Sequence, residues 1–362
     1  MINRRQFTLG AGAGALAMTA AGLSVSSFAA SNFTPTQRAF IMDAMGEIRE
    51  VYTDSLCREM IDSGINSVTV TLCDPKSFEG VAYEWAMDGV LSYDRLIEQE
   101  SEFWTKATTV DDIHAARTEG KIALFYLFQN STQFGRDLDN VDVFYGLGVR
   151  SSQITYNYQN WAGAGCNEIN GSGLTEFGYE LVEKMNDIGM LIDLSHANMR
   201  TMADTIAASA APVIVSHSCC KALYDHPRNT TDENIRAVAE KGGIFGVTQM
   251  RPFMTRQIDN AVHFYYEHIE HAINMAGIDN VCIGSDRDHR RLVLTEEYLQ
   301  ELEREEGENF DRAMWPLYFE ELNGPRRMET IWDGLASRGM NEDNLEKVFG
   351  LNLQRLYREV IG

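Results

Sequence analysis

Eight short apolar segments rich in β-branched residues recur along the chain, and they limit its fold more than any other feature. Several are apolar almost throughout, which is typical of strands covered on both faces. Segments of helical periodicity separate them; one has an N-cap pattern at Thr231 and a stop at Gly242. The eight segments are residues 40–47, 65–72, 121–129, 151–158, 190–196, 212–218, 242–250 and 280–286. This alternation predicts a single-domain α/β fold, the (β/α)8 barrel of the TIM type.

Two stretches interrupt the alternation, at about residues 73–111 and about residues 289–341. The first is polar and aromatic, and the second is long and acidic. Each follows the end of a predicted strand. Because barrel enzymes carry their active sites at the carboxyl ends of the strands, both insertions are placed to cover such a site.

Residues 1–30 have the composition of an export signal. Arg4 and Arg5 precede an uncharged stretch of small apolar residues that ends at Ser27-Phe28-Ala29, a pattern typical of the twin-arginine signal. An uncleaved membrane anchor is the alternative. We expect a periplasmic or otherwise exported protein whose mature chain, residues 31–362, contains the barrel and no membrane span.

The composition excludes some partners. Against 31 lysines and arginines stand 53 aspartates and glutamates, a net charge of −22, which argues against nucleic acid or an anionic membrane surface. The six cysteines form no CxxC pattern. The adjacent Cys219 and Cys220 leave two interpretations open: ligands of a soft metal, or loop thiols beside a strand end.

Polar side chains lie at the ends of most of the predicted strands. Each alone is more often a satisfied core residue, but their repetition at one edge of a barrel indicates a site. Two successive strands end in His196 and His217, and the last ends in Asp286; the others are Glu47, Gln129, Tyr156 and Asn157. Imidazole nitrogens suit zinc, and a catalytic zinc leaves one coordination position open for water. A metal site is therefore predicted.

The sequence resembles the renal (membrane) dipeptidases, peptidase family M19. The segments "GLTEFGYELVEKMNDIGMLIDLSH", "APVIVSHS", "HPRNTTDENIRAV", "IGSDRD" and "NLEKVFGLNLQRLYREV" follow the family pattern in order over nearly all of the mature chain. The resemblance implies that His196 and His217 bind metal, that Arg228 binds the substrate and that Asp286 is catalytic. It also implies a homodimer.

The chain departs from the family pattern at three strand ends. Met45 and Glu47 stand where the pattern has a His-x-Asp pair, Gln129 where it has a bridging glutamate, and Tyr156 where it has a histidine. A thioether is a poor zinc ligand, and an amide brings no charge to hold two dications. We therefore expect one zinc ion per chain, or another divalent metal, held by His196 and His217 with Gln129, Glu47 or Asp286 completing the site.

The resemblance implies a metal-dependent hydrolase that cleaves the amide bond of a dipeptide or a related small carboxylated amide. Asp286 would accept a proton from water and pass it to the leaving amine. Tyr156 or Asn157 would stabilise the oxyanion, and Arg228 would bind a substrate carboxylate. A barrel that binds a small carboxylated ligand without turnover is the alternative, because the metal ligands are substituted. A third possibility is an enzyme acting on another amide or ester.

Overall fold

The computed structural model describes residues 40–168, 170–306 and 311–362. The predicted export signal, residues 1–30, lies outside these ranges, so export stays a prediction.

Eight parallel strands form a barrel, as predicted. They pair in the order β1-β2-β4-β5-β6-β7-β8-β9. The seam between β9 and β1 is bridged at the carboxyl ends, where Asp286 N donates to Met45 O (2.7 Å) and Glu47 N donates to Arg287 O (3.1 Å). The strands are β1 (Ile41–Gly46), β2 (Ile65–Thr71), β4 (Ile122–Phe128), β5 (Val149–Gln153), β6 (Leu191–Asp193), β7 (Ile214–Ser218), β8 (Ile244–Val247) and β9 (Val281–Ile283).

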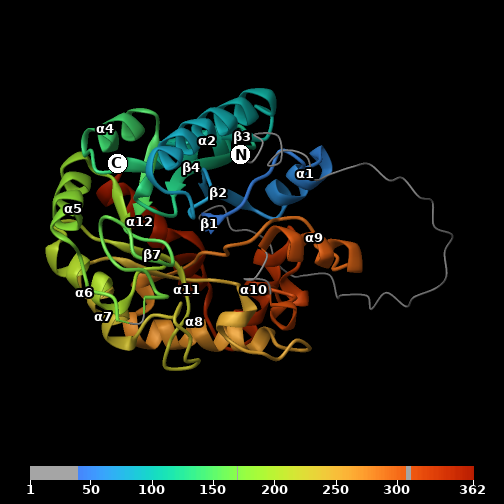
Figure 1. Cartoon of the computed structure of the whole chain (residues 1–362). Coiled ribbons are helices and arrows are strands. Elements are labelled where there is room, and N and C mark those ends of the chain that lie inside the picture. The colour runs from blue at the N-terminus through green and yellow to red at the C-terminus, as the bar shows by residue number, and fades with distance from the viewer. Residues whose placement is uncertain (1–39, 169, 307–310) are drawn as a thin grey trace, which may run out of the picture. The chain divides into compact units, whose positions relative to one another are not determined.

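Helices alternate with the strands along the chain, and Figure 1 shows α5 to α8 following one another around the barrel. Thr231 caps α7 by accepting a hydrogen bond from Asn234 N, and Gly242 follows with φ of 81°, so both predicted helix signals are confirmed. The helices are α1 (Asp54–Asp62), α2 (Glu79–Gln99), α3 (Val110–Thr118), α4 (Asp139–Gly146), α5 (Glu176–Ile188), α6 (Met199–Ala208), α7 (Asp232–Glu240), α8 (Val262–Ala276), α9 (Glu296–Glu306), α10 (Arg327–Ser337), α11 (Glu342–Glu346) and α12 (Asn352–Val360), the last two joined by the π-helix η7 (Lys347–Leu351).

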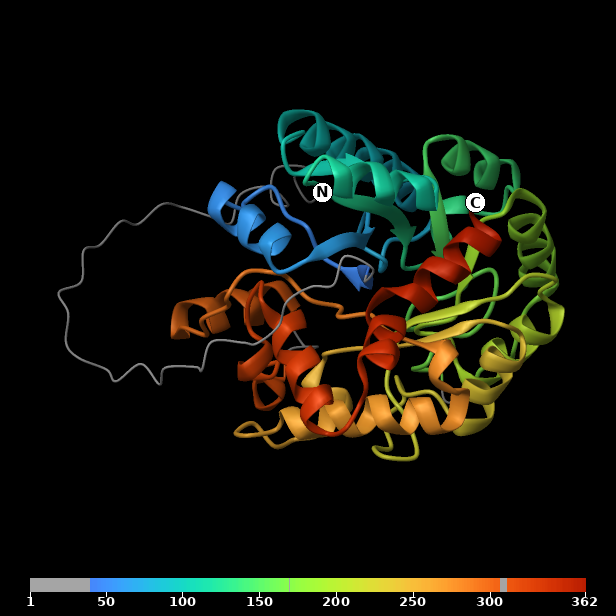
Figure 2. The ribbon, with the colours of Figure 1, turned by 180° about the vertical axis from the view of Figure 1, so that it is seen from behind.

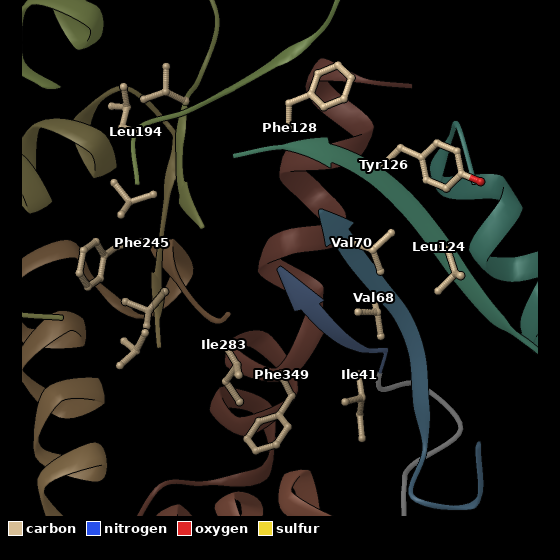
Figure 3. Close-up of a cluster of buried hydrophobic side chains, with 14 of the residues drawn as sticks. Ile41, Val68, Val70, Leu124, Tyr126, Phe128, Leu194, Phe245, Ile283 and Phe349 are labelled. Carbon is tan, nitrogen blue, oxygen red and sulfur yellow. The ribbon is translucent and has the colours of Figure 1, made fainter. Parts of the chain in front are cut away.

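The hydrophobic residues divide between two sides of the barrel wall. Alternate residues of β2 and β4, including Val68, Val70 and Leu124, belong to the large cluster that the outer helices cover (Figure 3). Intervening residues such as Ala123 and Phe125 pack with Leu353 and Tyr357 of α12. Figure 2 shows α12 lying across the strands on this side. Because these inward residues lie near the starts of their strands, α12 covers the amino end and leaves the carboxyl end for the site.

The insertion at 73–111 is mostly helical, and its predicted role as a cover of the site stays a prediction. It contains α2 and the start of α3, and a short strand that was not predicted, β3 (Trp104–Lys106), which pairs with the amino end of β4. Its first residues reach the carboxyl end, where Pro75 O accepts a hydrogen bond from Asn130 Nδ2 (2.8 Å). Helix α2 also packs against η1 (Thr132–Phe134), the turn that follows β4. A three-residue strand gives too short a pattern to separate from a loop.

Part of the insertion at 289–341 lies over the carboxyl end of the barrel. Arg251, in the loop after β8, donates through its guanidinium to Pro316 O (2.9 Å) and Met314 O (2.6 Å), which fixes this segment over the end of β8. At the seam, Arg327 of α10 is fully buried and lies 3.7 Å from Asp43 of β1. Asp43 also accepts hydrogen bonds from Ser285 N and Oγ (2.7 and 2.5 Å). This buried cluster anchors α10 to the point where the barrel closes.

Two glycines allow the strands to approach closely beside His217. A Cβ on Gly246 or Gly284 would lie 2.0 or 1.8 Å from the backbone oxygen of Ser216. We expect Gly284→Ala to lower the free energy of unfolding by about 1–3 kcal/mol, measured by urea denaturation, because β9 must move away from β7. Gly80→Ala is the matched control, since nothing lies within 4 Å of its added Cβ. An unchanged midpoint for Gly284→Ala would contradict this packing.

Candidate metal and active site

The two predicted histidines converge at the carboxyl ends of neighbouring strands. His196 follows β6, His217 lies in β7, and both are buried. Their Nε2 atoms are 3.1 Å apart, and the ring centroids are 5.1 Å apart. Burial lowers the pKa of both imidazoles well below the usual value, and the Arg228 guanidinium adds to this effect. Both rings are therefore neutral at neutral pH.

Hydrogen bonds fix the tautomer of His217. Ser216 Oγ donates to Asp193 Oδ2 (2.5 Å) and so accepts from His217 Nδ1 (2.7 Å). Asp193 is itself held, because its Oδ1 accepts from the backbone N–H groups of Ser195 (2.9 Å) and Ser216 (3.0 Å). With the proton on Nδ1, the Nε2 of His217 presents a lone pair to the site.

Asn157 fixes the tautomer of His196. Its Oδ1 lies 2.6 Å from His196 Nδ1, where the amide oxygen accepts and the ring nitrogen donates. The contact gives Asn157 a positioning role through its Oδ1. Its Nδ2 is not used by this contact, so its predicted role in binding the oxyanion stays a prediction. The ring of Tyr156 stacks on the same imidazole with centroids 4.2 Å apart.

The two Nε2 lone pairs thus face each other, which is repulsive unless a cation or proton lies between them. A shared proton requires either an imidazolium, against the lowered pKa values, or loss of one Nδ1 hydrogen bond. Two nitrogens bound to a tetrahedral zinc at about 2.0–2.1 Å each lie about 3.3 Å apart. The observed 3.1 Å is close to this spacing, so the imidazole pair fits a divalent metal.

Backbone strain coincides with the predicted residues. Four non-glycine residues of the described chain have clearly positive φ, and two of them are His196 (68°) and Asp286 (56°). Such conformations cost of order 1–3 kcal/mol and persist where the surroundings impose them, often at functional sites. The strands therefore end in backbone conformations that aim these two side chains.

Asp286 has the properties of a general base. Its carboxylate has no hydrogen bond or ion pair to any described residue. Burial raises its pKa to about 7; the nearby Arg228 opposes this increase and Glu47 adds to it, with smaller effects of Arg287 and Asp43. A carboxyl group that titrates near neutrality can accept and release a proton during turnover.

Arg228 is buried beside the histidines. Its Nη2 donates to His217 O (2.7 Å), while its Nε is buried without a partner. The guanidinium also lies over the ring of Phe253, 5.9 Å from the centroid. It forms no ion pair with a described residue, so it retains its capacity to bind an anion.

The side chains of Glu47 and Gln129 form no hydrogen bond with His196 or His217. The Glu47 carboxylate pairs with Arg49 and is partly exposed. The side-chain amide of Gln129, just after β4, is buried and has no hydrogen bond within the described ranges. Their predicted roles as metal ligands stay predictions.

The described residues contain no group of three histidine, cysteine, aspartate or glutamate side chains close enough to hold a metal ion. Cys219 and Cys220 are buried thiols; Cys220 Sγ donates to His268 O (3.5 Å). Their interpretation as metal ligands is not supported by this placement.

Sequence reasoning missed three residues around this site. Asp193 and Ser216 are polar residues inside the apolar segments "LIDLSH" and "VIVSHS". Arg287 lies between Asp286 and Asp288. A polar residue inside an apolar strand was the signal available for the first two.

Comparison with known proteins supports the resemblance. The model of the family described as membrane dipeptidase (peptidase family M19) matches residues 46–298. The chain belongs to the membrane dipeptidase family.

Individual relatives agree with this assignment. An uncharacterized dipeptidase of Schizosaccharomyces pombe is 35% identical over 188 residues, which are 49% of this chain and 44% of that protein. Dipeptidase verJ of Clonostachys rogersoniana is 29% identical over 73% of this chain and 62% of its own length. The crystal structure of an amidohydrolase from Pseudomonas aeruginosa superimposes with a TM-score of 0.79 and 29% identity, covering 90% of this chain and 97% of that one.

The chain matches only part of the length of its curated relatives. The matches span between 44% and 69% of the length of four curated relatives. Within the part of this membrane dipeptidase homologue that the structure describes, no helix has both the length and the apolar character needed to cross a bilayer.

The hydrogen bonds on Nδ1 lead to a test that needs no substrate. We expect Ser216→Ala to weaken zinc binding by about 10–100-fold, because His217 loses the partner that fixes its tautomer. Competition with a chromophoric zinc chelator measures the affinity. Ser151→Ala is the control, since this buried hydroxyl donates to Leu191 O instead. Equal affinities of the two variants would contradict the role of Ser216.

Proposed function

We propose that this chain is a metal-dependent hydrolase that cleaves the amide bond of a dipeptide or a related small carboxylated amide, with one zinc ion or other divalent metal per chain. The carrying observation is the 3.1 Å separation of two imidazole Nε2 atoms whose Nδ1 positions are both engaged in hydrogen bonds. Membership of the membrane dipeptidase family supports the reaction class.

His196 and His217 would hold the metal, and the Gln129 amide oxygen is the proposed third ligand. Glu47 is a weaker choice because Arg49 already neutralises its carboxylate. A divalent metal bound there would supply Lewis acidity to the amide carbonyl and to water. One dication suits a site whose protein ligands are neutral better than two would.

The remaining steps fall to residues of the chain. Asp286 accepts a proton from the attacking water and delivers it to the departing amine. Burial raises the pKa of Tyr156, so its hydroxyl keeps its proton and can donate to the developing oxyanion. Arg228, which lacks a carboxylate partner, binds the carboxylate of the substrate through its planar guanidinium.

A second candidate function is binding of a small carboxylated ligand without turnover. The observation that favours it is the absence, within the described residues, of a third histidine, cysteine or carboxylate beside the imidazole pair. Under this second function the protein binds dipeptides without cleaving them, whereas the hydrolase cleaves them.

Metal analysis combined with a dipeptide panel tests the proposal. We expect about one equivalent of zinc in the purified protein, hydrolysis of at least one dipeptide, and loss of both in His196→Ala. His114→Ala is the matched control, because this exposed histidine of α3 lies against Phe40, which precedes β1 at the amino end of the barrel. A zinc-loaded protein that binds dipeptides without cleaving them would establish the second function instead. Two equivalents of zinc would contradict the single-metal site.

The raised pKa of Asp286 gives an expected pH dependence. The carboxylate form is the base, so kcat/KM should rise with pH through about 7 and level off above it. In Asp286→Asn we expect activity to fall by at least about 100-fold, since general base catalysis is removed. A profile that stays flat from about pH 5 to about pH 9, about two units on either side of this value, would contradict the assignment of Asp286.

A further inference from the structure

Arg287 is a buried cation without a counterion. It lies between Asp286 and Asp288 just after β9, and only 7% of its surface is exposed. Its guanidinium lies over the ring of Tyr318, 4.9 Å from the centroid. Among the described residues its side chain has no hydrogen bond and no ion pair.

The neighbouring carboxylates are already engaged by other groups. Asp288 pairs with Arg290 (2.6 Å) and Arg49 (3.1 Å) and accepts from the Tyr52 hydroxyl (2.8 Å). Glu47 pairs with Arg49. Asp286, the adjacent residue, forms no ion pair within the described chain. Of the neighbouring acids in the described chain, only Asp286 is therefore free of another cation, and it forms no ion pair at contact distance with Arg287.

Tyr318 places Arg287 beneath the segment that covers the end of β8. Arg251 N donates to Leu317 O (2.9 Å), and the Tyr318 hydroxyl donates to Leu292 O (3.1 Å). The segment is therefore held on one side by the loop after β8 and on the other by the loop after β9. Arg287 lies between this cover and the strand end that carries Asp286.

Arg287 and Arg228 are two buried cations at the same end of the barrel. Arg287 directly follows Asp286 in the chain, and Arg228 donates to the backbone of His217. Arg228 uses one of its five donors, on His217 O, and Arg287 uses none on a described residue. Two buried guanidinia with free donors exceed what the single terminal carboxylate of a neutral dipeptide requires.

Burial of an unpaired cation is unfavourable unless an anion joins it. This chain has an excess of acids and a net charge of −22, so a structural counterion was readily available. A guanidinium left unpaired at the site is instead suited to a ligand carboxylate, which it can bind through two parallel hydrogen bonds.

We propose that the substrates are dipeptides with an acidic side chain, whose side-chain carboxylate is bound by Arg287 while Arg228 binds the terminal carboxylate. This inference rests on the proposed function and specifies its substrate class. The alternative role of Arg287 is purely structural, holding the cover through Tyr318.

The test compares acidic dipeptides with their amide isosteres. For the zinc-loaded full chain we expect kcat/KM to be at least about tenfold higher for Ala-Glu or Glu-Ala than for Ala-Gln or Gln-Ala, from one charge-assisted contact. Arg287→Met should abolish this ratio, and Arg287→Lys should keep part of it. Arg291→Met is the control, an exposed arginine that pairs with Glu320; its ratio should equal that of the wild type.

Isothermal titration with the same four peptides separates this inference from the proposed function. Hydrolysis without preference for acidic peptides would overturn the inference and leave the function intact. Binding that prefers acidic peptides, without cleavage of any, would overturn the function and retain the role of Arg287. If Arg287→Met also lowers thermal stability, the ratio of kcat/KM values measured with Arg287→Lys, which keeps the positive charge, decides between the two roles of Arg287. A wild-type ratio near one, or a ratio unchanged in both variants, would show that Arg287 is structural.

Discussion

The central constraint in this structure is the mutual orientation of two neutral imidazoles. Each Nδ1 is engaged from behind, by Asn157 at 2.6 Å and by Ser216 at 2.7 Å, so that both Nε2 lone pairs face one point. This arrangement is unfavourable in an empty, dry site and favourable around a cation. The polar residues within the barrel, and the strained backbone at His196, serve this orientation.

The barrel supplies the rigidity that the orientation needs. Gly246 and Gly284 let two strands pack against the Ser216 carbonyl, immediately before His217. At the seam, the buried Asp43, Ser285 and Arg327 join β1 to β9 and to α10, and the adjacent backbone bonds bring Met45 and Asp286 together. Removing one member of such a buried charge pair would leave the other uncompensated, which is strongly destabilising. The position of Asp286, the proposed general base, therefore depends on a cluster that takes no part in the proposed chemistry.

Most of the fold and part of the site could be predicted from the sequence. The eight barrel strands and the cap at Thr231 follow from local patterns, and the convergence of His196 with His217 follows from their places at neighbouring strand ends. The role of Asn157 could not be predicted, because its partner His196 lies 39 residues away. The path of the loop after β5 brings the two side chains together. The same holds for Arg327, which lies in an acidic insertion with no periodic link to Asp43. The strand β3 was missed because three residues carry no usable period.

Anomalous X-ray diffraction at the zinc absorption edge, on crystals of the zinc-loaded protein, shows whether the two imidazoles share one metal ion. We expect a single anomalous peak at about 2.0–2.1 Å from Nε2 of both His196 and His217. A peak bound to only one of these rings, a second peak beside Glu47, or no peak between the two imidazoles would contradict it.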